Sequence, residues 1–554
     1  MLKKISLKNN FLVIVLIFLS LIPLLDLFYP GLPKTHDGQD HVARIANFYL
    51  NLTYGNIIPR WAPNLNWGYG HPILMFLYPF PSYFASFFHV LGFSFVDSVK
   101  LVFGVTFILS GLSMYLFMSS FTNRFAGFAS AVVYMFAPYR FVDLYVRGAI
   151  GEHVAFIFPP LILYFLYRIS KHQSPWNVLL GALSFSGLIL SHNAISLMFL
   201  PIILLFVIYV LLQTKEKWRV IVFQSILMLG FGFLVSAFFW IPAFVEGKYT
   251  LRDIVTENEY LNRFEPFSHF LYSPWSYGGT GLLSVQIGLV QWAVVLLQPI
   301  LLFRFYKKNT YIFGLALSLF ILFWITIFLM MDISIPVYQI VTTLQKFQFP
   351  WRFLTLTVFF TSVISGLFVL SLPKKTQFTI ALLLAGLLLF VNRNYWQANE
   401  YLTYPESFYT GIYNGTTDTG ESAPIWSVRF MLERPDEVIE VIEGDATITE
   451  VMRTSTSRKY IIDANERTRI RENTLYFPGW NVYVNGSSSE IEFQDQLNRG
   501  LITYFVPKGI NDVTIIFENT KLRFFAEVLS LGGLVGLGVY FFIFKKIILW
   551  RHFQ

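Results

Sequence analysis

The chain of 554 residues contains no cysteine and few charged residues. Without cysteine, disulfides, thiolate metal sites and a cysteine nucleophile are all excluded. Charged residues make up 13% of the sequence, whereas a typical soluble domain has about 25%. Because 55% of the residues are hydrophobic and 19% are aromatic, a soluble globular enzyme and a disordered chain are excluded as well. The composition indicates a lipid-facing protein with aromatic belts at the membrane interfaces.

The few charges are distributed unevenly. Residues 393–521 hold 12 Lys+Arg and 19 Asp+Glu, a net charge of −7, and the rest of the chain carries a net charge of +15. A basic membrane part joined to an acidic soluble part is the pattern of cytoplasmic loops combined with an external domain. No nucleic-acid partner is expected, because no basic cluster lies on a soluble face.

Apolar segments long enough to cross a bilayer recur along the sequence. They predict a polytopic α-helical membrane protein of about 12 transmembrane helices, at residues 11–29, 98–118, 126–138, 153–170, 177–191, 194–213, 219–241, 281–303, 310–331, 353–371, 376–392 and 524–546. Basic residues gather at Lys3 and Lys4 and in short connections between alternate spans, such as Lys374-Lys375. Because cytoplasmic loops are enriched in Lys and Arg, both termini are expected on the cytoplasmic side.

One further apolar segment, residues 73–92, is ambiguous. An even number of spans must separate the outer connections 30–72 and 139–152, so either 73–92 or 126–138 does not cross. The prolines and aromatic residues of 73–92 favour a helix that lies in the interface. In the alternative, 126–138 does not cross, and the residues assigned to the outer face stay the same.

The sequence predicts a change of architecture after residue 392. Charge density rises there, and short alternating strands with turn signals follow, including an Asn485-Gly486 hairpin. We expect a transmembrane domain at 1–392, with a large first external loop at 30–97, an external β-sandwich at 393–521, and a final transmembrane helix with a cytoplasmic tail at 522–554. The β-domain either binds a carbohydrate or an acceptor, or it acts as a structural cap that packs on the membrane domain. The sequence favours the cap slightly, because no ligand-specific cluster of residues stands out.

Ionisable residues gather at the outer ends of the predicted spans, while mid-span charges are scarce, which disfavours an ion-coupled transporter. Asp37, Asp40, His41 and Arg44 are spaced to share one face of an interfacial helix. The same outer face is expected to hold Arg60, Arg140, Asp143, Arg147, Glu152, His153, His192, Asn193, Glu246, Lys248, Lys346 and Arg352. Ordinary ion pairs explain any single one of these residues, but their convergence from several connections favours a site.

This set of residues suits the transfer of a sugar from a lipid-linked phosphate. A carboxylate can act as a base for the acceptor hydroxyl or hold a metal, and it can stabilise positive charge at the anomeric carbon. Arginine binds the oxygens of the leaving phosphate. A phospholipid-binding surface would also use arginine, so the residue types alone do not specify the reaction.

Several ordered blocks carry a family resemblance. The stretch THDGQDHVARIANFYLNLTYGNIIPRWAPNLNWGYGHPILMFLYPFPSYF and the later blocks YVRGAIGEHVAFIFPP, LSHNAISL, FFWIPAFVEG and QKFQFPWRF resemble bacterial multipass membrane proteins with a 6-pyruvoyl-tetrahydropterin synthase-related domain. The C-terminal PGWNVYVNG and VPKGINDVTIIF are similar to external domains of membrane proteins that add sugars to envelope polymers. Both groups resemble the GT-C glycosyltransferase superfamily.

The resemblance implies a glycosyltransferase in the bacterial plasma membrane. Its donor would be a sugar on a polyprenyl phosphate, its acceptor an envelope glycan, lipid or protein, and its active face external. Asp37 then matches the first-loop acid, with Asp40 second, and Glu152 or Asp143 matches the second acid. The expected catalytic residues are Asp37, Asp40 and Glu152, and the expected substrate-binding residues are His41, Arg44, Arg60, Arg140, Arg147, His192, Asn193, Glu246 and Arg352.

Two questions stay open at this point. A divalent metal, Mg or Mn, is one possibility, with Asp37 and Glu152 as its ligands, although Asp37 and Asp40 are three residues apart and form no paired-acid motif. The alternative functions are a flippase for a lipid-linked glycan and a non-enzymatic envelope assembly protein. For a transferase, Asp37, Arg147 and Glu152 should line one outer cavity, with Asp37 within about 15 Å of at least one of the others.

Overall fold

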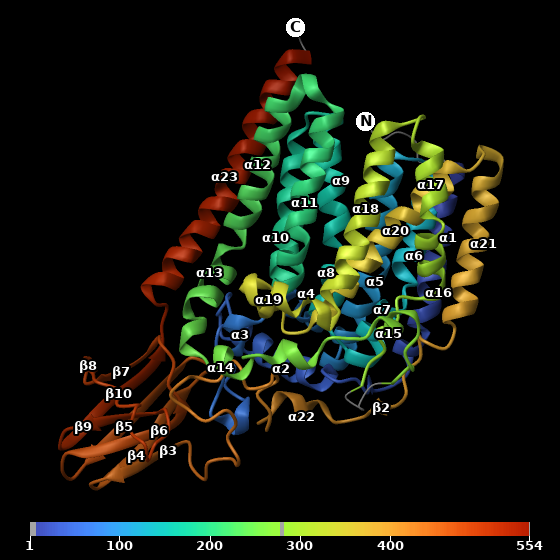
Figure 1. The fold of residues 1–554 in the computed structure, drawn as a ribbon. Helices are drawn as coiled ribbons and strands as arrows, with labels where there is room; N and C mark the ends of the chain where they lie inside the picture. Colours follow the sequence, from blue (N-terminus) through green and yellow to red (C-terminus); the bar gives the residue numbers. More distant parts are fainter. Residues whose placement is uncertain (1–6, 278–281, 553–554) are drawn as a thin grey trace.

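The computed structural model describes residues 7–277 and 282–552. Its α-helices are α1 (Leu7–Leu21), α2 (Gly38–Thr53), α3 (Ile73–Phe76), α4 (Phe80–Val90), α5 (Phe95–Phe121), α6 (Arg124–Met135), α7 (Pro138–Phe141), α8 (Ile150–Ala155), α9 (Phe158–Lys171), α10 (Pro175–Ser191), α11 (Asn193–Gln213), α12 (Trp218–Val235), α13 (Ala237–Val245), α14 (Arg252–Val255), α15 (Phe267–Leu271), α16 (Leu289–Leu296), α17 (Gln298–Phe305), α18 (Thr310–Leu329), α19 (Ile335–Ile340), α20 (Leu354–Ser371), α21 (Lys374–Asn392), α22 (Glu406–Thr410) and α23 (Lys521–His552). The long helices form a bundle (Figure 1).

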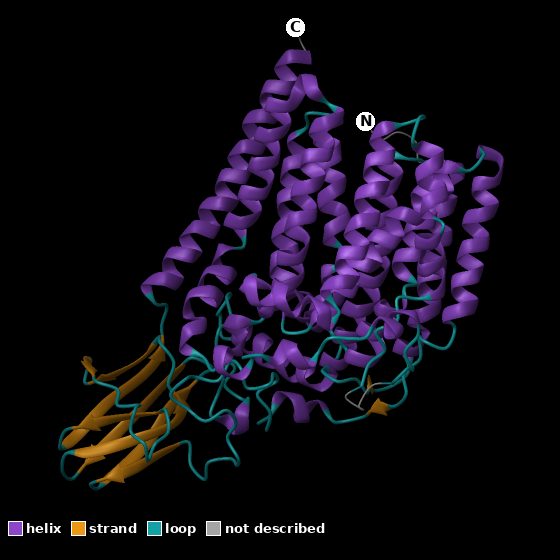
Figure 2. Cartoon of the chain, in the orientation of Figure 1, coloured by secondary structure: helices purple, strands orange, loops and turns teal. Residues whose placement is uncertain are grey.

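The strands are β1 (Leu32–Pro33), β2 (Tyr401–Leu402), β3 (Ile439–Glu443), β4 (Ala446–Arg453), β5 (Ser457–Ala464), β6 (Thr468–Leu475), β7 (Trp480–Val484), β8 (Ser487–Ser489), β9 (Leu501–Val506) and β10 (Gly509–Phe517). Strands β3 to β10 lie together at one end of the helical bundle (Figure 2). The basic α11–α12 and α17–α18 connections lie at the opposite end, where α23 also ends (Figure 1). The ends of the bundle are therefore chemically different.

Among the described residues, nine helices are long and apolar enough to cross a membrane: Phe11–Phe28, Phe95–Phe121, Ile150–Lys171, Asn193–Gln213, Trp218–Val235, Thr310–Leu329, Pro350–Ser371, Lys374–Asn392 and Lys521–Lys545. They correspond to nine of the predicted spans. Arg124–Met135 and Pro138–Arg147 pass the same test only as a pair bent by 50°. Pro175–Ser191 and Leu289–Phe305 are shorter apolar helices. A total of 12 crossings therefore stays a prediction.

The structure bears on three expectations from the sequence. Residues 73–92 fold into the short helices α3 and α4, which fits their assignment as non-crossing. The predicted span 219–241 breaks at Ser236, between α12 and α13. The Ser236 hydroxyl donates to the carbonyl oxygen of Gly232 (2.8 Å). It thus competes with main-chain N–H groups for a carbonyl in the last turn of α12. Lys3, Lys4 and residue 281 lie outside the described residues.

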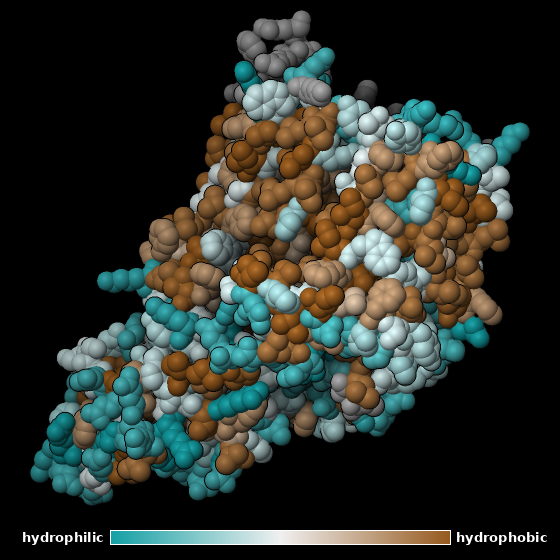
Figure 3. All heavy atoms as spheres, in the orientation of Figure 1, coloured by the Kyte–Doolittle hydropathy of each residue, from teal (hydrophilic) through white to brown (hydrophobic). Residues whose placement is uncertain are grey.

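The surface supports a membrane-embedded bundle. In the view of Figure 3, apolar residues cover the long helices, and hydrophilic residues gather over the β-strands and the loops next to them. Within the bundle, α20 packs on α6, and α6 packs on α5. A Cβ atom on Gly366 of α20 would lie 2.1 Å from the Ser130 hydroxyl of α6, and one on Gly111 of α5 would lie 2.2 Å from the Met135 sulfur. Small residues thus allow the close helix contact that is common in membrane bundles.

The C-terminal strands form two antiparallel sheets. One has the order β4-β5-β10-β7-β8 and the other β3-β6-β9. Buried side chains from both sheets, such as Ile462, Val513, Ile470 and Ile502, belong to one hydrophobic cluster. The predicted hairpin is present, because β7 pairs with β8 across Asn485 and Gly486. Both turn residues have positive φ, at 53° and 78°, as a tight type I′ turn requires.

The segment between α21 and β3 runs back along the bundle before the two sheets begin. β2 in this segment pairs with β1, which follows the first membrane helix, and the Lys34 ammonium pairs with the Glu400 carboxylate at 2.7 Å. The segment 393–438 is therefore packed on the first loop of the membrane part. This placement brings residues that are more than 370 positions apart in sequence to the same end of the bundle.

Candidate functional site

A buried ion cluster lies at the end of the bundle that carries the sheets. The Arg147 Nη1 atom donates to Glu152 Oε2 (2.6 Å) and to Asp143 Oδ1 (2.7 Å). The other Glu152 oxygen accepts from the hydroxyls of Tyr139 (2.7 Å) and Thr355 (3.0 Å). Asp143 and Glu152 are fully buried. Each Glu152 oxygen thus has a donor, as a carboxylate removed from water needs.

An irregular backbone positions this cluster. Residues Val142–Arg147 form a turn of π-helix, and Gly148 follows in the left-handed conformation with φ 68°. The wider turn places Asp143 and Arg147 on one side, and π-helical turns are frequent at functional sites. A Cβ on Gly148 would lie 2.3 Å from the Thr35 hydroxyl. Glycine is therefore needed there both for its φ and for the close approach of the first loop.

The first loop brings Asp37 to this cluster. The N–H groups of His36 and Asp37 donate to the carbonyl oxygens of Val146 (3.0 Å) and Arg147 (2.9 Å). Asp37 is the N-cap residue of α2, and its side chain is exposed and has no hydrogen-bond or ion-pair partner among the described residues. The structure therefore places Asp37, Arg147 and Glu152 side by side. The helix α2 starts at Gly38, and the Thr35 hydroxyl accepts from the Gly38 N–H (3.0 Å).

The first turns of α2 contact the C-terminal segment. Asp40 Oδ1 accepts from the Tyr413 hydroxyl (2.8 Å), and Arg44 Nε donates to the Thr417 hydroxyl (3.1 Å). Arg44 also contacts His41 Nδ1 at 3.0 Å. Burial raises the pKa of Asp40, partly offset by the Tyr413 hydrogen bond and Arg44. Burial and the Arg44 charge lower the pKa of His41 well below its usual range, so this imidazole is neutral.

Residues 413–422 thus form a cover for the first loop, which the sequence did not reveal as part of the site. Asp418 lies 3.6 Å from the buried His71 imidazole and accepts from the backbone N–H groups of Gly420 (2.8 Å) and Ser422 (3.0 Å). Burial acts to raise the pKa of Asp418, but His71 and these N–H groups lower it below its usual value overall. The only sequence signal was the turn-rich stretch GTTDTGES, which resembles any surface loop.

Arg352 and His192 complete the buried cluster. Arg352 Nε lies 3.8 Å from Glu152 Oε2 and has no hydrogen-bond acceptor among the described residues, while its Nη1 donates to the Phe347 carbonyl (2.9 Å). His192 stacks on Tyr78 with ring centres 5.0 Å apart, and its Nδ1 accepts from the Ile195 N–H (3.3 Å). Burial and Arg352 lower the pKa of His192 to about 3. Arg352 is thus an arginine of the cluster with donors still free.

A small cavity lies next to α2, but Asp37, Arg147 and Glu152, which were expected to line one cavity, do not line it. It is lined by His41, Arg44, Phe48, Leu74, Tyr78 and Ile150, among others. Its volume of about 10 Å³ is near the minimum that one water needs. A cavity of this size does not hold a sugar or a lipid phosphate.

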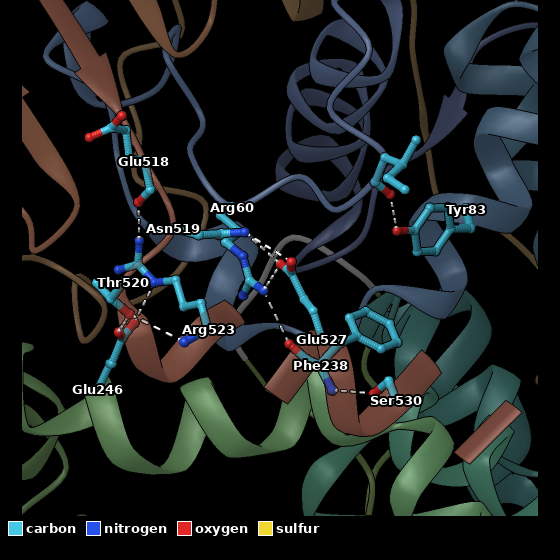
Figure 4. Close-up of polar contacts among 11 residues, drawn as sticks. Arg60, Tyr83, Phe238, Glu246, Glu518, Asn519, Thr520, Arg523, Glu527 and Ser530 are labelled. Carbon is cyan, nitrogen blue, oxygen red and sulfur yellow. Dashed lines mark hydrogen bonds and ion pairs between the residues drawn. The ribbon is translucent and has the colours of Figure 1, made fainter. Parts of the chain in front are cut away.

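Four predicted site residues lie elsewhere. Glu246 accepts from Arg523 Nε (2.8 Å) and from the Thr520 hydroxyl (2.9 Å), which ties α13 to the start of α23 (Figure 4). Arg60 pairs with Glu527 at 2.8 Å beside the same junction (Figure 4). Both hold the sheets and α23 to the bundle. The sequence grouped both with the Asp37 site, but residues at the same end of the bundle need not share a site.

The other two are Arg140 and Asn193. Arg140 is fully buried, donates to the Ser110 hydroxyl (2.9 Å) and lies over the Phe156 ring at 3.9 Å. It thus points into the helix packing and does not contact the Glu152 cluster. Asn193 is an exposed first residue of α11, and its side chain forms no hydrogen bond among the described residues. Of this pair, His192 caps the helix, because its Nδ1 accepts from the Ile195 N–H.

The expected Mg or Mn ligand pair, Asp37 and Glu152, does not fit a metal as drawn. Both Glu152 oxygens accept hydrogen bonds, and the Arg147 guanidinium, which is a cation, lies 2.6 Å away. Hard divalent cations need several free oxygen ligands. Within residues 7–277 and 282–552, no group of three or more His, Asp or Glu side chains is placed to hold a metal ion. The carboxylate left for an ion is that of Asp37.

Comparisons with known proteins agree with a membrane protein. A family model described as "6-pyruvoyl-tetrahydropterin synthase related domain; membrane protein" matches residues 74–399, more than half of the chain. An uncharacterized protein of Lactococcus lactis subsp. cremoris (strain MG1363) is 26% identical over 251 residues, which is 42% of this chain and 40% of that protein. The chain thus matches less than half the length of this relative.

Three similar solved structures come from bacteria and an archaeon. The arabinofuranosyltransferase AftD from Mycobacteria has a TM-score of 0.42 at 15% identity, covering 71% of this chain and 27% of that one. ArnT from Cupriavidus metallidurans, bound to undecaprenyl phosphate, has a TM-score of 0.41 at 12% identity over 73% and 68%. The Archaeoglobus fulgidus oligosaccharyltransferase has 0.42 at 14% identity over 74% and 56%. Scores of this size do not transfer an activity or a residue role.

Proposed function

The chain belongs to the 6-pyruvoyl-tetrahydropterin synthase-related family of membrane proteins, and from that premise we propose that it is a membrane glycosyltransferase. The donor is a sugar on a polyprenyl phosphate, and the acceptor is a hydroxyl-bearing glycan, lipid or protein of the cell envelope. One observation supports this most directly. The exposed carboxylate of Asp37, which has no partner among the residues that the structure describes, is held by its backbone against a buried cluster of acids and arginines.

Each part of the cluster has a place in the transfer. Asp37 takes the proton of the acceptor hydroxyl as its oxygen forms a bond to the anomeric carbon. The bond from that carbon to the phosphate oxygen breaks, and the electron pair leaves with the phosphate. The free N–H groups of Arg352 bind the phosphate oxygens as their charge grows. Arg147 is already engaged by two carboxylates, so we assign it to holding Glu152 in place.

Glu152 then acts through position and charge. Its two oxygens are fixed by Arg147, Tyr139 and Thr355, so it is preorganised beside the reacting centre. A fixed negative charge there stabilises the positive charge that develops at the anomeric carbon. A bound Mg or Mn ion, if the enzyme uses one, would have Asp37 as its ligand and would orient the donor phosphate.

The proposed orientation follows from the basic connections. Arg304, Lys307 and Lys308 lie in the α17–α18 connection, and Lys374-Lys375 begins α21. The α17–α18 connection lies at the end of the bundle away from the sheets (Figure 1). We propose that this end is cytoplasmic, with both termini, and that the Asp37 site and the sheets face the outside of a bacterial plasma membrane. The phosphate of a polyprenyl carrier lies at the depth of the lipid headgroups, where this orientation puts the Asp37 site.

The test is to identify lipids that co-purify with the detergent-solubilised protein, by native mass spectrometry of the wild type and of Asp37→Asn. A transferase predicts that a sugar-loaded polyprenyl-phosphate species accumulates on Asp37→Asn, because the donor binds but is not consumed. Equal amounts of a lipid-linked glycan on both proteins would instead indicate a flippase. Bulk phospholipid alone on both would indicate an assembly role and contradict the proposal.

A further inference from the structure

Four aromatic side chains from three separate segments meet outside the Asp37 site. Tyr476 and Phe493 stack with ring centres 3.7 Å apart and planes at 14°. Trp426 contacts both, at 5.6 Å and 5.0 Å, and stacks on Tyr249 at 5.8 Å. All four side chains are half-buried. We call these four residues the aromatic platform, and the proposed reaction does not use them.

Two rings of the platform, Tyr249 and Tyr476, pack against the hydrophobic cluster of the sheets, and the other two do not. Trp426 and Phe493 belong to neither of the two hydrophobic clusters found among the described residues. Their backbone is nevertheless held firmly. The Ile425 N–H donates to the Tyr249 carbonyl (2.9 Å), and Thr250 forms a bridge with Pro424. Rings that are fixed but left partly open to solvent form a preorganised binding surface.

Paired charged and amide groups surround one side of the platform. Phe493 lies between Glu492 and Asp495, which both pair with Arg469, at 2.9 Å and 3.2 Å. Arg471 next along the same strand donates to Asn498 Oδ1 (3.2 Å). Aromatic faces beside fixed carboxylate, guanidinium and amide groups match a sugar ring, which has C–H groups on its faces and hydroxyls on its edge. A lipid tail would displace the water that contacts these groups and offer no polar atom in its place.

The surrounding charge narrows the ligand further. The segment 393–521 has a net charge of −7, which disfavours nucleic acids, lipid phosphates and acidic polysaccharides.

The platform also continues the cover of the site. Glu421, in the cover, lies within electrostatic range of Arg352, and Trp426 follows five residues later. Five extended residues span at most about 17 Å, so a single oligosaccharide can extend from the platform to the cover.

We propose that the aromatic platform binds an uncharged oligosaccharide, as the acceptor chain of the transferase. The role of the oligosaccharide as an acceptor rests on the proposed function, whereas its binding to the platform does not. An oligosaccharide lying on Trp426 and Phe493 extends its end along the 413–422 cover toward Asp37. The two sheets then serve to hold a substrate as well as to complete the fold.

The test measures binding directly, so that it does not depend on transfer. Short uncharged gluco-, manno- and galacto-oligosaccharides are titrated into the full-length protein in detergent, by saturation-transfer NMR and calorimetry. We expect at least one series to bind the wild type. Trp426→Ala and Phe493→Ala should each weaken binding by about tenfold, the size of effect seen when one stacking contact is lost. Trp426→Phe should keep most of the affinity.

Two controls separate the outcomes. Trp218→Ala removes an exposed tryptophan at the start of α12, and it should leave binding unchanged. Asp37→Asn should bind the oligosaccharide as the wild type does, even though we expect it to lose transfer. If no uncharged series binds the wild type, or if folded Trp426→Ala and Phe493→Ala both bind normally, the proposal is wrong, and this result leaves the proposed transfer reaction standing.

Discussion

The main-chain N–H of Asp37 donates to the carbonyl oxygen of Arg147 at 2.9 Å, while the Arg147 side chain turns inward to Glu152 at 2.6 Å. One residue of the buried cluster therefore holds the exposed acid through its backbone. The arrangement separates two tasks. The inner acid is neutralised and fixed, and the outer acid is left free for a proton, a metal ion or a substrate.

This separation predicts that Asp37→Asn loses transfer without losing stability. The side chain is exposed and has no partner among the described residues, so the free energy of unfolding should change by less than about 0.5 kcal/mol. Asparagine cannot accept the hydroxyl proton, so transfer from a lipid-linked sugar should fall by at least about a hundredfold. Thermal unfolding and a radiolabelled transfer assay measure the two quantities. Normal transfer by Asp37→Asn would remove this residue from the reaction.

Unlike Asp37→Asn, Glu152→Gln should lose stability as well as transfer. Glutamine removes one of the two carboxylates that pair with the buried Arg147. Removing one member of a buried ion pair costs roughly 3–5 kcal/mol of stability. We expect a clear fall in the thermal unfolding temperature together with lost transfer. The double variant Glu152→Leu with Arg147→Met should recover part of this stability but no activity. If Glu152→Gln unfolds like the wild type, the ion pair does not hold the site.

The Glu246–Arg523 pair is predicted to be structural. Its side chains are 4% and 0% exposed, and they link α13 to α23. Glu246→Gln should therefore destabilise the protein by roughly 3–5 kcal/mol. The matched control is Asp253→Asn, which breaks the exposed pair with Lys346 at 2.7 Å, close to the 2.8 Å of the Glu246–Arg523 pair, and should cost less than about 1 kcal/mol. Oligosaccharide and lipid binding by the folded fraction of Glu246→Gln should stay normal, whereas a selective loss of lipid binding would return Glu246 to the site.

The sequence predicted the helices better than the site, for a physical reason. Hydropathy is a local property, so the runs at 194–213 and 353–371 could be assigned without knowledge of their neighbours. The outer ends of the helices were also predictable, because charges cannot lie at mid-span without cost. Asp37, Arg147 and Glu152 could thus be placed at one end together, and their contacts in the structure agree with that placement.

Contacts between distant segments could not be read in this way. Tyr413 and Thr417 reach Asp40 and Arg44 across 373 residues, and hydroxyl groups in a turn-rich loop give no periodic signal. Tyr139 and Thr355 look like ordinary helix residues until Glu152 is placed between them. Conversely, Arg140 follows the outer-face pattern but turns into the aromatic packing around Phe156. Charge pattern predicts depth in the membrane, not direction around the helix.

A metal dependence, if it exists, should depend on Asp37 alone. Glu152 is already neutralised by Arg147 at 2.6 Å, so removing divalent cations with EDTA should leave the thermal unfolding temperature unchanged. If Mg or Mn stimulates transfer by the wild type, Glu152→Asp should keep part of that stimulation and Asp37→Asn should lose it. An unfolding temperature that falls in EDTA and recovers with Mg would contradict the absence of Glu152 from the ligand set.

The protein should lose stability as the pH falls below about 6.5. The pKa of His192 is lowered to about 3, by burial first and by Arg352 second, and burial also lowers the pKa of His41. The unfolded chain therefore binds protons between pH 6.5 and pH 3 that the folded chain does not, so unfolding is favoured as the pH falls through this window. At pH 5, one such histidine contributes about 2 kcal/mol to this loss. Asp40, whose pKa is raised, acts in the opposite direction at lower pH.

The variant His192→Gln isolates this contribution. Glutamine does not titrate, and its amide oxygen can still accept from the Ile195 N–H that His192 now caps. Unfolding temperatures at pH 7 and pH 5 should therefore differ less in His192→Gln than in the wild type. His172→Gln is the control, because His172 is exposed at the far end of α9 and should leave the pH dependence as it is. An equal pH dependence in wild type and His192→Gln would mean that His192 is protonated in the folded state, with Glu152 as the nearby charge that makes this possible.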